Sequence, residues 1–246
     1  MKNQYVGDIG DYGKYGLLRF ISNSGIRIGV NWYLTKNDEH IVDGNIRGYL
    51  KDDAESVYDC KVYELLKNIP NRDIVYIEKS GILSNSIYYN EELSFEGVPP
   101  NERKAVRTRW HSKGMKALED TDIVFADPDN GSTEDKKGAR KNGEKYITIR
   151  EIADYYQRGQ NIVYYCHRAR RNQESWQKKM IEIKTECPDA EIIVLTFHRG
   201  TQRSYIFCVH PSQFEEYDCI VEDFLSTAWG RISADGKKQP PFTRER

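Results

Sequence analysis

Apolar runs of strand length alternate with amphipathic stretches along most of this chain. The runs are rich in Ile, Val, Tyr and Phe, and most are apolar at every position, as strands buried on both faces of a sheet are. We predict strands at 26–34, 73–78, 122–126, 161–167, 191–198 and 204–210. The amphipathic stretches predict helices at 14–22, 57–68, 102–118, 149–158, 173–187 and 213–227. This alternation predicts an α/β fold of three layers, with helices on both faces of a largely parallel sheet.

The last two predicted strands are joined differently from the others. Only residues 199–203 separate them, and this short connection contains a glycine, which predicts a hairpin. We therefore expect an antiparallel C-terminal hairpin at one edge of the sheet. Residues 81–100 are polar and predict a loop, whereas residues 131–145 have no apolar anchor and predict a mobile basic loop. We interpret 1–234 as a single α/β domain and 235–246 as a flexible tail.

Composition places this pattern in a globular chain of 246 residues. Hydrophobic residues make up 38% and charged residues 30%, and no run approaches the roughly 20 apolar residues of a membrane span. The first residues show no apolar segment typical of a signal peptide. The five cysteines are scattered and form no CxxC pair, which argues against a zinc knuckle and fits a reducing compartment. We therefore expect a cytoplasmic protein with no membrane partner, and the sequence leaves its oligomeric state open.

The net charge is only −1, but the basic residues are clustered, at 103–116, 136–145, 168–179 and 237–246. A nearly neutral chain with local basic stretches can bind nucleic acid through one face. Each cluster alone is more simply explained as a solvated helix face, but three of them are expected near the candidate site described next. We therefore predict DNA as a partner. Contacts with its backbone are expected from Lys136, Lys137, Arg140, Lys141, Arg168, Arg170 and Arg171.

The strongest local feature is the segment 123–131, in which an apolar strand runs directly into Asp-Pro and then into Asn-Gly. Proline ends the strand, and Asn-Gly favours a tight turn. In open α/β sheets, ligands bind outside the carboxyl ends of the strands. Asp127, Asp129 and Asn130 therefore stand where a site is expected, with the two aspartates as candidate catalytic residues. The alternative is a turn stabilised by an Asx cap, with no ligand.

A second cluster, at 7–16, places four glycines at every third position among two Asp, two Tyr and one Lys. We predict a loop that leads into the first helix, with Asp11 as a candidate N-cap. Backbone amides at such a helix start can bind phosphate, although the spacing matches no glycine-rich nucleotide motif. A plain turn-rich helix start explains the pattern equally well. If the cluster is a ligand face, its side chains are Asp11, Tyr12, Lys14 and Tyr15.

The end of the first predicted strand offers further candidates for substrate binding. Asn31 lies in an apolar run, where a buried amide needs a partner. The amide could read a base edge because it offers both a donor and an acceptor, or it could be satisfied by the backbone. Trp32 and Tyr33 follow it, and their rings could stack on a base.

Three histidines end predicted strands. His167 and His198 come from sequential strands that are expected to be parallel, so both should share an edge of the sheet with Asp127. A histidine at that edge could stabilise an anionic leaving group, and both are candidate catalytic residues. His210 ends an antiparallel strand and is expected at the opposite end of the sheet. Each histidine can also be interpreted as a solvated strand end.

Two parts of the chain resemble nucleic-acid methyltransferases that act on amino groups. The strand followed by Asp127-Pro128 is similar to their catalytic DPPY motif. The stretch 10–18, Gly-Asp-Tyr-x-Lys-Tyr-x-Leu-Leu, resembles the start of a group of ribosomal-RNA adenine methyltransferases. The resemblance implies S-adenosylmethionine as a cofactor. The chain departs from that pattern because no glycine-rich loop follows the first strand, and because Asn130 replaces the aromatic residue that stacks the target base.

A second resemblance is to uracil-DNA-glycosylase-like enzymes. Asp127-Pro128 is similar to their QDPY-type motif, whose aspartate activates water, Asn31 to their base-reading asparagine, and His210-Pro211-Ser212 to their HPS-type segment. The order of Asn31 and Asp127 departs from that family. This likeness implies hydrolysis of an N-glycosidic bond without a metal or an organic cofactor.

Both resemblances concern enzymes that act on a flipped base. Our leading hypothesis at this point is a DNA glycosylase that excises a base, one modified by phage for example, and so serves phage defence. The alternatives are an S-adenosylmethionine-dependent nucleic-acid methyltransferase, a non-catalytic binding module, and a nuclease. In a nuclease, Asp8, Asp11, Asp43 and Asp127 would hold Mg²⁺.

Overall fold

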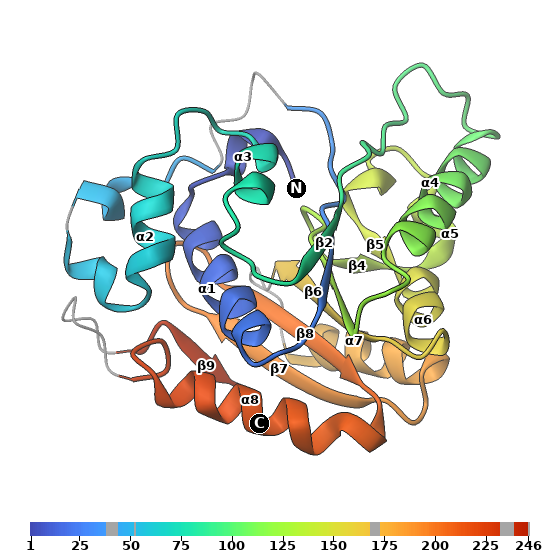
Figure 1. Cartoon of the computed structure of the whole chain (residues 1–246). Helices are drawn as coiled ribbons and strands as arrows, with labels where there is room; N and C mark the ends of the chain where they lie inside the picture. Colours follow the sequence, from blue (N-terminus) through green and yellow to red (C-terminus); the bar gives the residue numbers. More distant parts are fainter. Residues whose placement is uncertain (38–43, 52, 168–172, 232–238, 246) are drawn as a thin grey trace.

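The fold was described from a computed structural model of the chain. The structure describes residues 1–37, 44–51, 53–167, 173–231 and 239–245. In this part of the chain, seven strands form one sheet in the order β2-β1-β3-β6-β8-β7-β9 (Figure 1). Pairing is parallel from β2 to β6 and antiparallel for β8 with both neighbours and for β9 with β7. The predicted α/β fold, with its antiparallel C-terminal strands, is therefore confirmed.

The elements have the following bounds. The strands of the sheet are β1 Ile28–Asn31, β2 Ser86–Tyr89, β3 Ile123–Ala126, β6 Asn161–His167, β7 Glu191–Phe197, β8 Arg203–Val209 and β9 Phe242–Arg244. A small second sheet pairs β4 Ser132–Thr133 with β5 Ile147–Thr148. The α-helices are α1 Ile9–Asn23, α2 Cys60–Lys67, α3 Ile74–Lys79, α4 Arg103–Ala117, α5 Asp135–Gly138, α6 Ile149–Gln157, α7 Gln173–Glu186 and α8 Phe214–Ser226.

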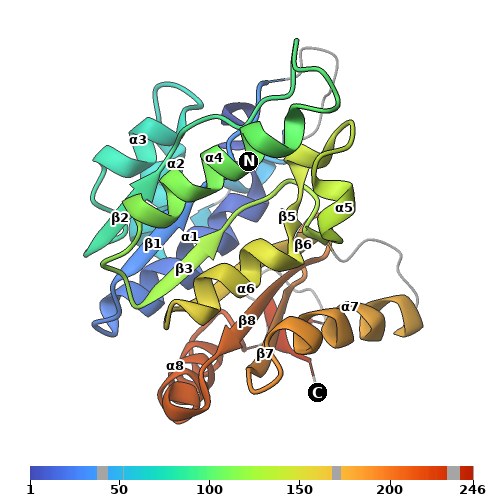
Figure 2. The same ribbon diagram turned by 90° about the vertical axis from the view of Figure 1, so that its right-hand side faces the viewer.

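Two hydrophobic cores lie on opposite faces of the sheet. Successive strand residues alternate between them: Phe125 points into the core shared with α1, α2, α3 and α8, and its neighbours Val124 and Ala126 point into the core shared with α4, α6 and α7. Side chains of a strand must alternate in this way, and burial on both faces explains why the strands are apolar throughout. Figures 1 and 2 show the two groups of helices on the two sides of the sheet.

The order of the strands creates a switch point between β1 and β3. From β1 the chain crosses to β2 on one side and then returns past β1 to β3 on the other side. The connection to β2 carries α2 and α3 on one face, and the connection to β3 carries α4 on the opposite face. Helices leaving to opposite faces open a crevice at the carboxyl ends of these two strands, which is where doubly wound sheets bind ligands.

Four predictions about elements need correction. The strand predicted at 73–78 is replaced by helix α3, Ile74–Lys79, because Asp73 caps the helix and Ile74 and Ile77 share its buried face. The polar segment 81–100 contains the edge strand β2. The segment 131–145, predicted as a mobile loop, contains β4, α5 and a 3-10 turn. The predicted flexible tail contributes β9, which pairs with β7.

Helix α1 begins earlier than predicted, and its glycines have a packing role. Its N-cap is Asp8, whose side chain accepts a hydrogen bond from the Gly10 amide (2.8 Å), so the proposed cap Asp11 lies inside the helix. The glycines at 10, 13 and 16 share one helix face. A Cβ atom at these positions would collide with the side chains of Arg203, Phe197 and Trp229, respectively. The repeat therefore allows close approach of the helix to the sheet.

Candidate functional site

A cavity of about 570 Å³ lies at the carboxyl ends of β3 and β6, against the first turns of α1. Its wall includes the turn Asp127–Asn130, the start of α1, and residues around the β7–β8 connection. The volume falls in the range of sites that hold small molecules or single bases. The cavity thus occupies the position that the strand order favours for a ligand.

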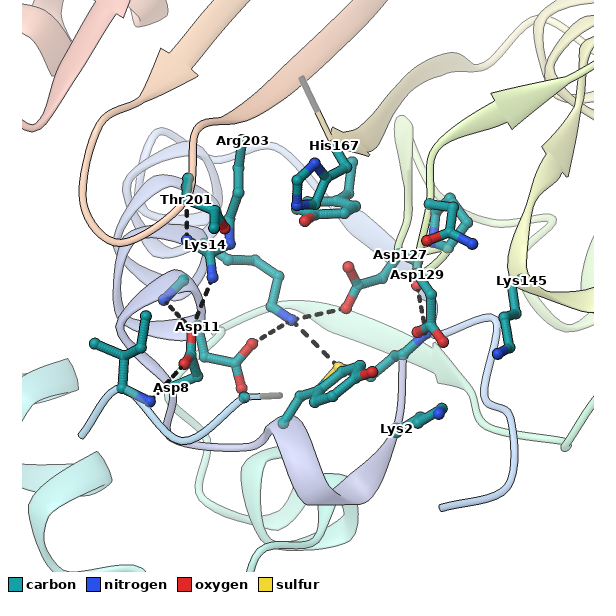
Figure 3. A pocket seen from close by; sticks show the side chains of 18 of the residues that line it. Lys2, Asp8, Asp11, Lys14, Asp127, Asp129, Lys145, His167, Thr201 and Arg203 are labelled. Atoms are coloured by element: carbon teal, nitrogen blue, oxygen red, sulfur yellow. Dashed lines mark hydrogen bonds and ion pairs between the residues drawn. The ribbon is translucent and has the colours of Figure 1, made fainter. Parts of the chain in front are cut away.

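A buried lysine joins α1 to the turn after β3. Lys14 Nζ lies 2.6 Å from Asp11 Oδ1 and 2.7 Å from Asp127 Oδ2, and all three side chains are at least 94% buried (Figure 3). Burial alone would lower the pKa of Lys14, but the two carboxylates raise it above its usual value. The ammonium therefore stays charged and fixes the orientation of Asp127.

The remaining contacts of Asp11 are also internal. Burial raises the pKa of Asp11 above its usual value, against the opposing effect of Lys14. Its second oxygen, Oδ2, accepts hydrogen bonds from the Gly7 amide (3.1 Å) and the Tyr15 hydroxyl (3.4 Å). Lys14 engages only Oδ2 of Asp127. The other oxygen, Oδ1, receives no hydrogen bond from the described residues.

An ammonium group already occupies the crevice between β1 and β3. The α-amino group of Met1 donates to the carbonyl oxygens of Tyr33 (3.1 Å) and Asp127 (2.8 Å), and it lies 2.7 Å from Asp129 Oδ1. The thioether sulfur of the same methionine lies 3.7 Å from Lys14 Nζ. Two carbonyls and a carboxylate thus form an ammonium cradle at the switch point of the sheet.

Several of the predicted site residues do come together. Asp127, Asp129 and Asn130 line the cavity from the turn after β3, Asp11 and Lys14 line it from α1, and His167 lines it from the end of β6. The α1 residues and the turn after β3 are more than 100 residues apart in the sequence. These two regions are those that carry the methyltransferase resemblance.

Other predicted substrate-binding residues do not reach the cavity. The Asn31 side chain is fully buried, where it donates to the Tyr155 hydroxyl (3.1 Å) and accepts from the Tyr33 amide (3.1 Å). The Tyr33 hydroxyl donates to Glu151 (3.3 Å) on the opposite face of the sheet. These polar groups thus have partners within the protein, and for Asn31 one partner is the backbone and the other is a tyrosine hydroxyl.

Three aromatic candidates form the packing around the site instead of a stacking surface. Tyr12 stacks on Tyr49 and donates its hydroxyl hydrogen to the Glu55 carbonyl (2.6 Å). Tyr15 and Trp32 are fully buried, and the Lys14 ammonium lies 5.0 and 5.5 Å from their ring centres. These two rings support the buried lysine through cation–π contacts.

The three histidines that follow or end strands lie in three different places. His167 and His198 end strands that point in the same direction, as expected, but only His167 lines the cavity. His198 lies near β9, with its ring nitrogen 2.7 Å from the Thr243 hydroxyl, and burial lowers its pKa. His210 lies at the opposite end of the sheet, stacked on Tyr156. His198 is therefore not among the residues that line this cavity.

The residues predicted to contact the DNA backbone also lie in different places. Lys136 and Lys137 both pair with Glu134 and line neither cavity. Arg140 lies outside the cavities, whereas Lys141 lines a second cavity described below. Arg168, Arg170 and Arg171 lie outside the described residues, as does Asp43.

No group of three or more potential metal ligands occurs within the described ranges. Three of the four carboxylates proposed as magnesium ligands are paired with cationic side chains: Asp8 with Arg203 (2.9 Å), and both Asp11 and Asp127 with the single ammonium of Lys14. Among the described helices, none is long and apolar enough to cross a membrane.

Sequence reasoning missed several lining residues. Tyr165 and Tyr205 form an aromatic wall, with ring centres 6.2 Å apart, and Arg203 holds Asp8. Lys2 and Lys145 also line the cavity. The position of Tyr165 near the end of a strand was the available signal, but a buried strand rich in tyrosine gives no indication of which ring borders a cavity.

Arg107 explains why the segment after the turn is structured. From α4 its guanidinium makes two hydrogen bonds to Glu151 (2.8 and 2.6 Å). It also donates to the carbonyls of Gly138, Gly143 and Tyr146, at 2.6 to 3.0 Å. One buried arginine thus anchors a segment that has no large apolar side chain.

A second cavity, of about 660 Å³, adjoins the first. It extends beyond the ends of β1 and β2 towards the start of α4, and Lys2 and Lys145 line both cavities. The two cavities therefore share one wall.

No protein-family model matches the chain, and no curated protein is similar enough in sequence to be a relative. Among solved structures, the fold is similar to that of the protein LPL1258 from Legionella pneumophila, which is assigned to the family model DUF519. The TM-score is 0.53, the sequence identity is 13%, and the match covers 97% of both chains. At this identity, the similarity shows a shared fold alone.

Proposed function

We propose that this protein is an S-adenosylmethionine-dependent methyltransferase that acts on an amino group of a nucleic-acid base. The observation that carries the proposal is the contact of Lys14 with Asp127, at 2.7 Å. It joins the two sequence features that resemble amino-methyltransferases, one in α1 and one after β3, in the wall of one cavity. That cavity lies at the switch point where doubly wound folds bind nucleotide ligands.

The ammonium cradle fits the amino-acid end of S-adenosylmethionine. The cradle holds the Met1 ammonium, and this group takes the place of the ammonium in the methionine part of S-adenosylmethionine. The thioether sulfur of Met1 lies beside Lys14. A ligand bound in this way would displace the Met1 amino group from Asp129. The chain has no glycine-rich loop after its first strand. The cradle therefore supplies hydrogen-bond acceptors for the cofactor ammonium in place of such a loop.

S-adenosylmethionine supplies an activated methyl group when bound. The protein's part is to hold and orient the acceptor amine. Oδ1 of Asp127 is positioned to accept a hydrogen bond from that amine, while Lys14 holds the other oxygen and keeps the carboxylate fixed. The partly exposed ring of Tyr165 provides aromatic surface for the base, and the buried ring of Tyr205 packs against it. Positioning of this kind is a large part of the catalysis of group transfer.

The base-excision hypothesis stays a prediction with less support from the geometry. Of the three features that resemble glycosylases, only Asp127 lines the cavity. Asn31 is bonded internally, and His210 lies at the other end of the sheet. A water-activating role for Asp127 also competes with its ion pair to Lys14.

One reaction distinguishes the two chemistries. Purified protein is incubated with S-adenosylmethionine carrying a deuterated methyl group and with single-stranded DNA and RNA pools, and released bases and digested nucleosides are measured by mass spectrometry. We expect a nucleoside heavier by the labelled methyl, and none with Asp127→Asn. Free base without labelled nucleoside would reject methylation in favour of excision.

A further inference from the structure

Lys2 is a buried lysine without a counter-ion. The residue is only 2% exposed, yet no carboxylate pairs with it anywhere in the described ranges. Its ammonium lies 5.7 Å from the centre of the Tyr5 ring. A buried cation without an anionic partner costs free energy, so proteins rarely keep one unless it has a function.

The position of Lys2 indicates where its missing anion binds. Lys2 and Lys145 both line the wall that the two cavities share, and both lie on the Asp129 side of the first cavity (Figure 3). Lys145 likewise has no ion pair with a described residue. The Lys145 carbonyl accepts a hydrogen bond from the Asn130 amide (3.0 Å), so the residue lies next to the turn Asp127–Asn130.

The second cavity continues this positive charge away from Asp127. Its lining contains five cationic side chains and two carboxylates. One of the carboxylates, Glu96, already pairs with the exposed Lys36; the other is Glu144. Arg103 and Lys141 extend the cationic wall beyond Lys2 and Lys145. Several cationic side chains in a cavity that adjoins a base-sized cavity suit a chain of phosphates better than a single small anion.

We propose that Lys2 and Lys145 form a phosphate-binding subsite at the junction of the two cavities. The subsite holds the phosphodiester next to the target nucleotide, and the second cavity carries the adjoining strand past Arg103 and Lys141. This proposal rests on the proposed function, which assigns the first cavity its role. The ligand chemistry, a single-stranded phosphodiester backbone, is common to DNA and RNA.

The test measures binding of fluorescent 12-nucleotide single strands, one of DNA and one of RNA, as a function of salt concentration. Lys2→Met and Lys145→Met should each weaken binding about tenfold, as loss of a charged hydrogen bond does. Each should also reduce the slope of log affinity against log salt by about 0.7, the value for one phosphate contact of a single strand. The strand that binds more tightly identifies the natural source.

Lys61→Met and Lys79→Met are the controls. They remove the same charge, but both lysines are exposed and line neither cavity. We expect unchanged affinity and slope. Equal losses in all four variants would overturn the subsite in favour of a diffuse surface charge, and unchanged binding of Lys2→Met and Lys145→Met would overturn it outright.

Three further measurements keep the test decisive. Lys2→Arg should retain binding, and Lys2→Met should melt at the wild-type temperature or above it because an unpaired buried charge is removed. If Lys2→Met does not fold, Lys145→Met carries the test alone. Calorimetric titration with S-adenosylmethionine should give the same affinity in both Met variants as in wild type. Strand binding without cofactor binding in the wild type would reject the methyltransferase and keep the phosphate subsite.

Discussion

Two buried ion clusters lie on opposite faces of the sheet, and they are built differently. In the cluster of Lys14, Asp11 and Asp127, the ion pairs form part of a cavity wall, and one carboxylate oxygen of Asp127 lacks a donor among the described residues. In the cluster of Arg107 and Glu151, the arginine makes five hydrogen bonds and lines neither cavity. The two clusters share buried charge and differ in their partners, and an incomplete set of partners beside a cavity is the feature that favours a functional role.

The largest expected effect on stability is in the saturated cluster. Arg107→Met leaves a buried carboxylate and three carbonyls without their donor, so the free energy of unfolding should fall by about 3–5 kcal/mol. Urea denaturation measures it. Arg109→Met, an exposed arginine two residues along α4, is the control and should change it by less than about 0.5 kcal/mol. An equally small change for both would mean that Arg107 is not an anchor.

The largest expected effect on activity is in the cluster at the cavity. Asp127→Asn removes the charge but keeps Lys14 paired with Asp11, so the protein should stay folded. Methyl transfer should fall about 10²–10³-fold, the usual cost of losing one preorganised group at the reacting atoms. Rates measured with the labelled cofactor test this. Asp120→Asn, an exposed aspartate, should retain the wild-type rate; retained activity in Asp127→Asn would remove the central residue of the proposal.

Acid should affect the two clusters in opposite directions. Burial would raise the pKa of Glu151, but Arg107 lowers it overall, so its stabilisation is present above the unfolded pKa near 4.5 and is lost as pH falls through the folded pKa. The pKa of Asp11 is raised, so its contribution is present below the unfolded value near 3.8 and is lost as pH rises through the folded pKa. A tenfold change in an acid dissociation constant on folding corresponds to about 1.4 kcal/mol of stability.

Urea denaturation between about pH 3 and pH 7 measures this contrast, in the range where carboxylates titrate. The difference in the free energy of unfolding between wild type and Glu151→Gln should shrink as the pH falls below 4.5. For Asp11→Asn, the free energy of unfolding relative to wild type should be highest at neutral pH. Parallel pH curves for the two variants would contradict the contrast between the clusters.

A smaller effect is expected where α1 approaches the sheet. An added Cβ at Gly13 would meet the Phe197 ring, so Gly13→Ala should cost about 1–3 kcal/mol through overpacking. It should also weaken activity, because Lys14 is carried on the same helix. Gly48→Ala, where nothing lies within 4 Å of the added atom, is the control. Equal thermal stability of the two variants would show that the glycine repeat has no packing role.

The sheet could be predicted because its central strands are buried on both faces and therefore carry an unmistakable apolar signal. Prediction failed at 73–78, where six residues are too few to separate a helical period from a strand. The loop predicted at the glycine repeat was also wrong. Glycines that allow close packing of a helix look the same in a sequence as glycines that form a loop.

The candidate site was predictable where a local motif marked it and unpredictable where long-range contacts built it. Asp127, Asp129 and Asn130 follow a strand, so their place at its carboxyl end could be predicted. The role of Lys14 depends on a carboxylate 113 residues away. The anchoring of 131–145 by Arg107 depends on a single side chain from another helix. Neither contact has a periodic signal in the sequence.

Calorimetric titration with S-adenosylmethionine is the sharpest test of the proposed methyl transfer, because it needs no nucleic-acid substrate. We expect saturable, one-to-one binding to the wild type and unchanged binding to Asp120→Asn. Binding to Asp129→Asn should be weaker by about tenfold or more, because the Asp129 carboxylate completes the ammonium cradle. Absence of binding to folded wild-type protein at millimolar cofactor would contradict the proposal that this cavity serves methyl transfer.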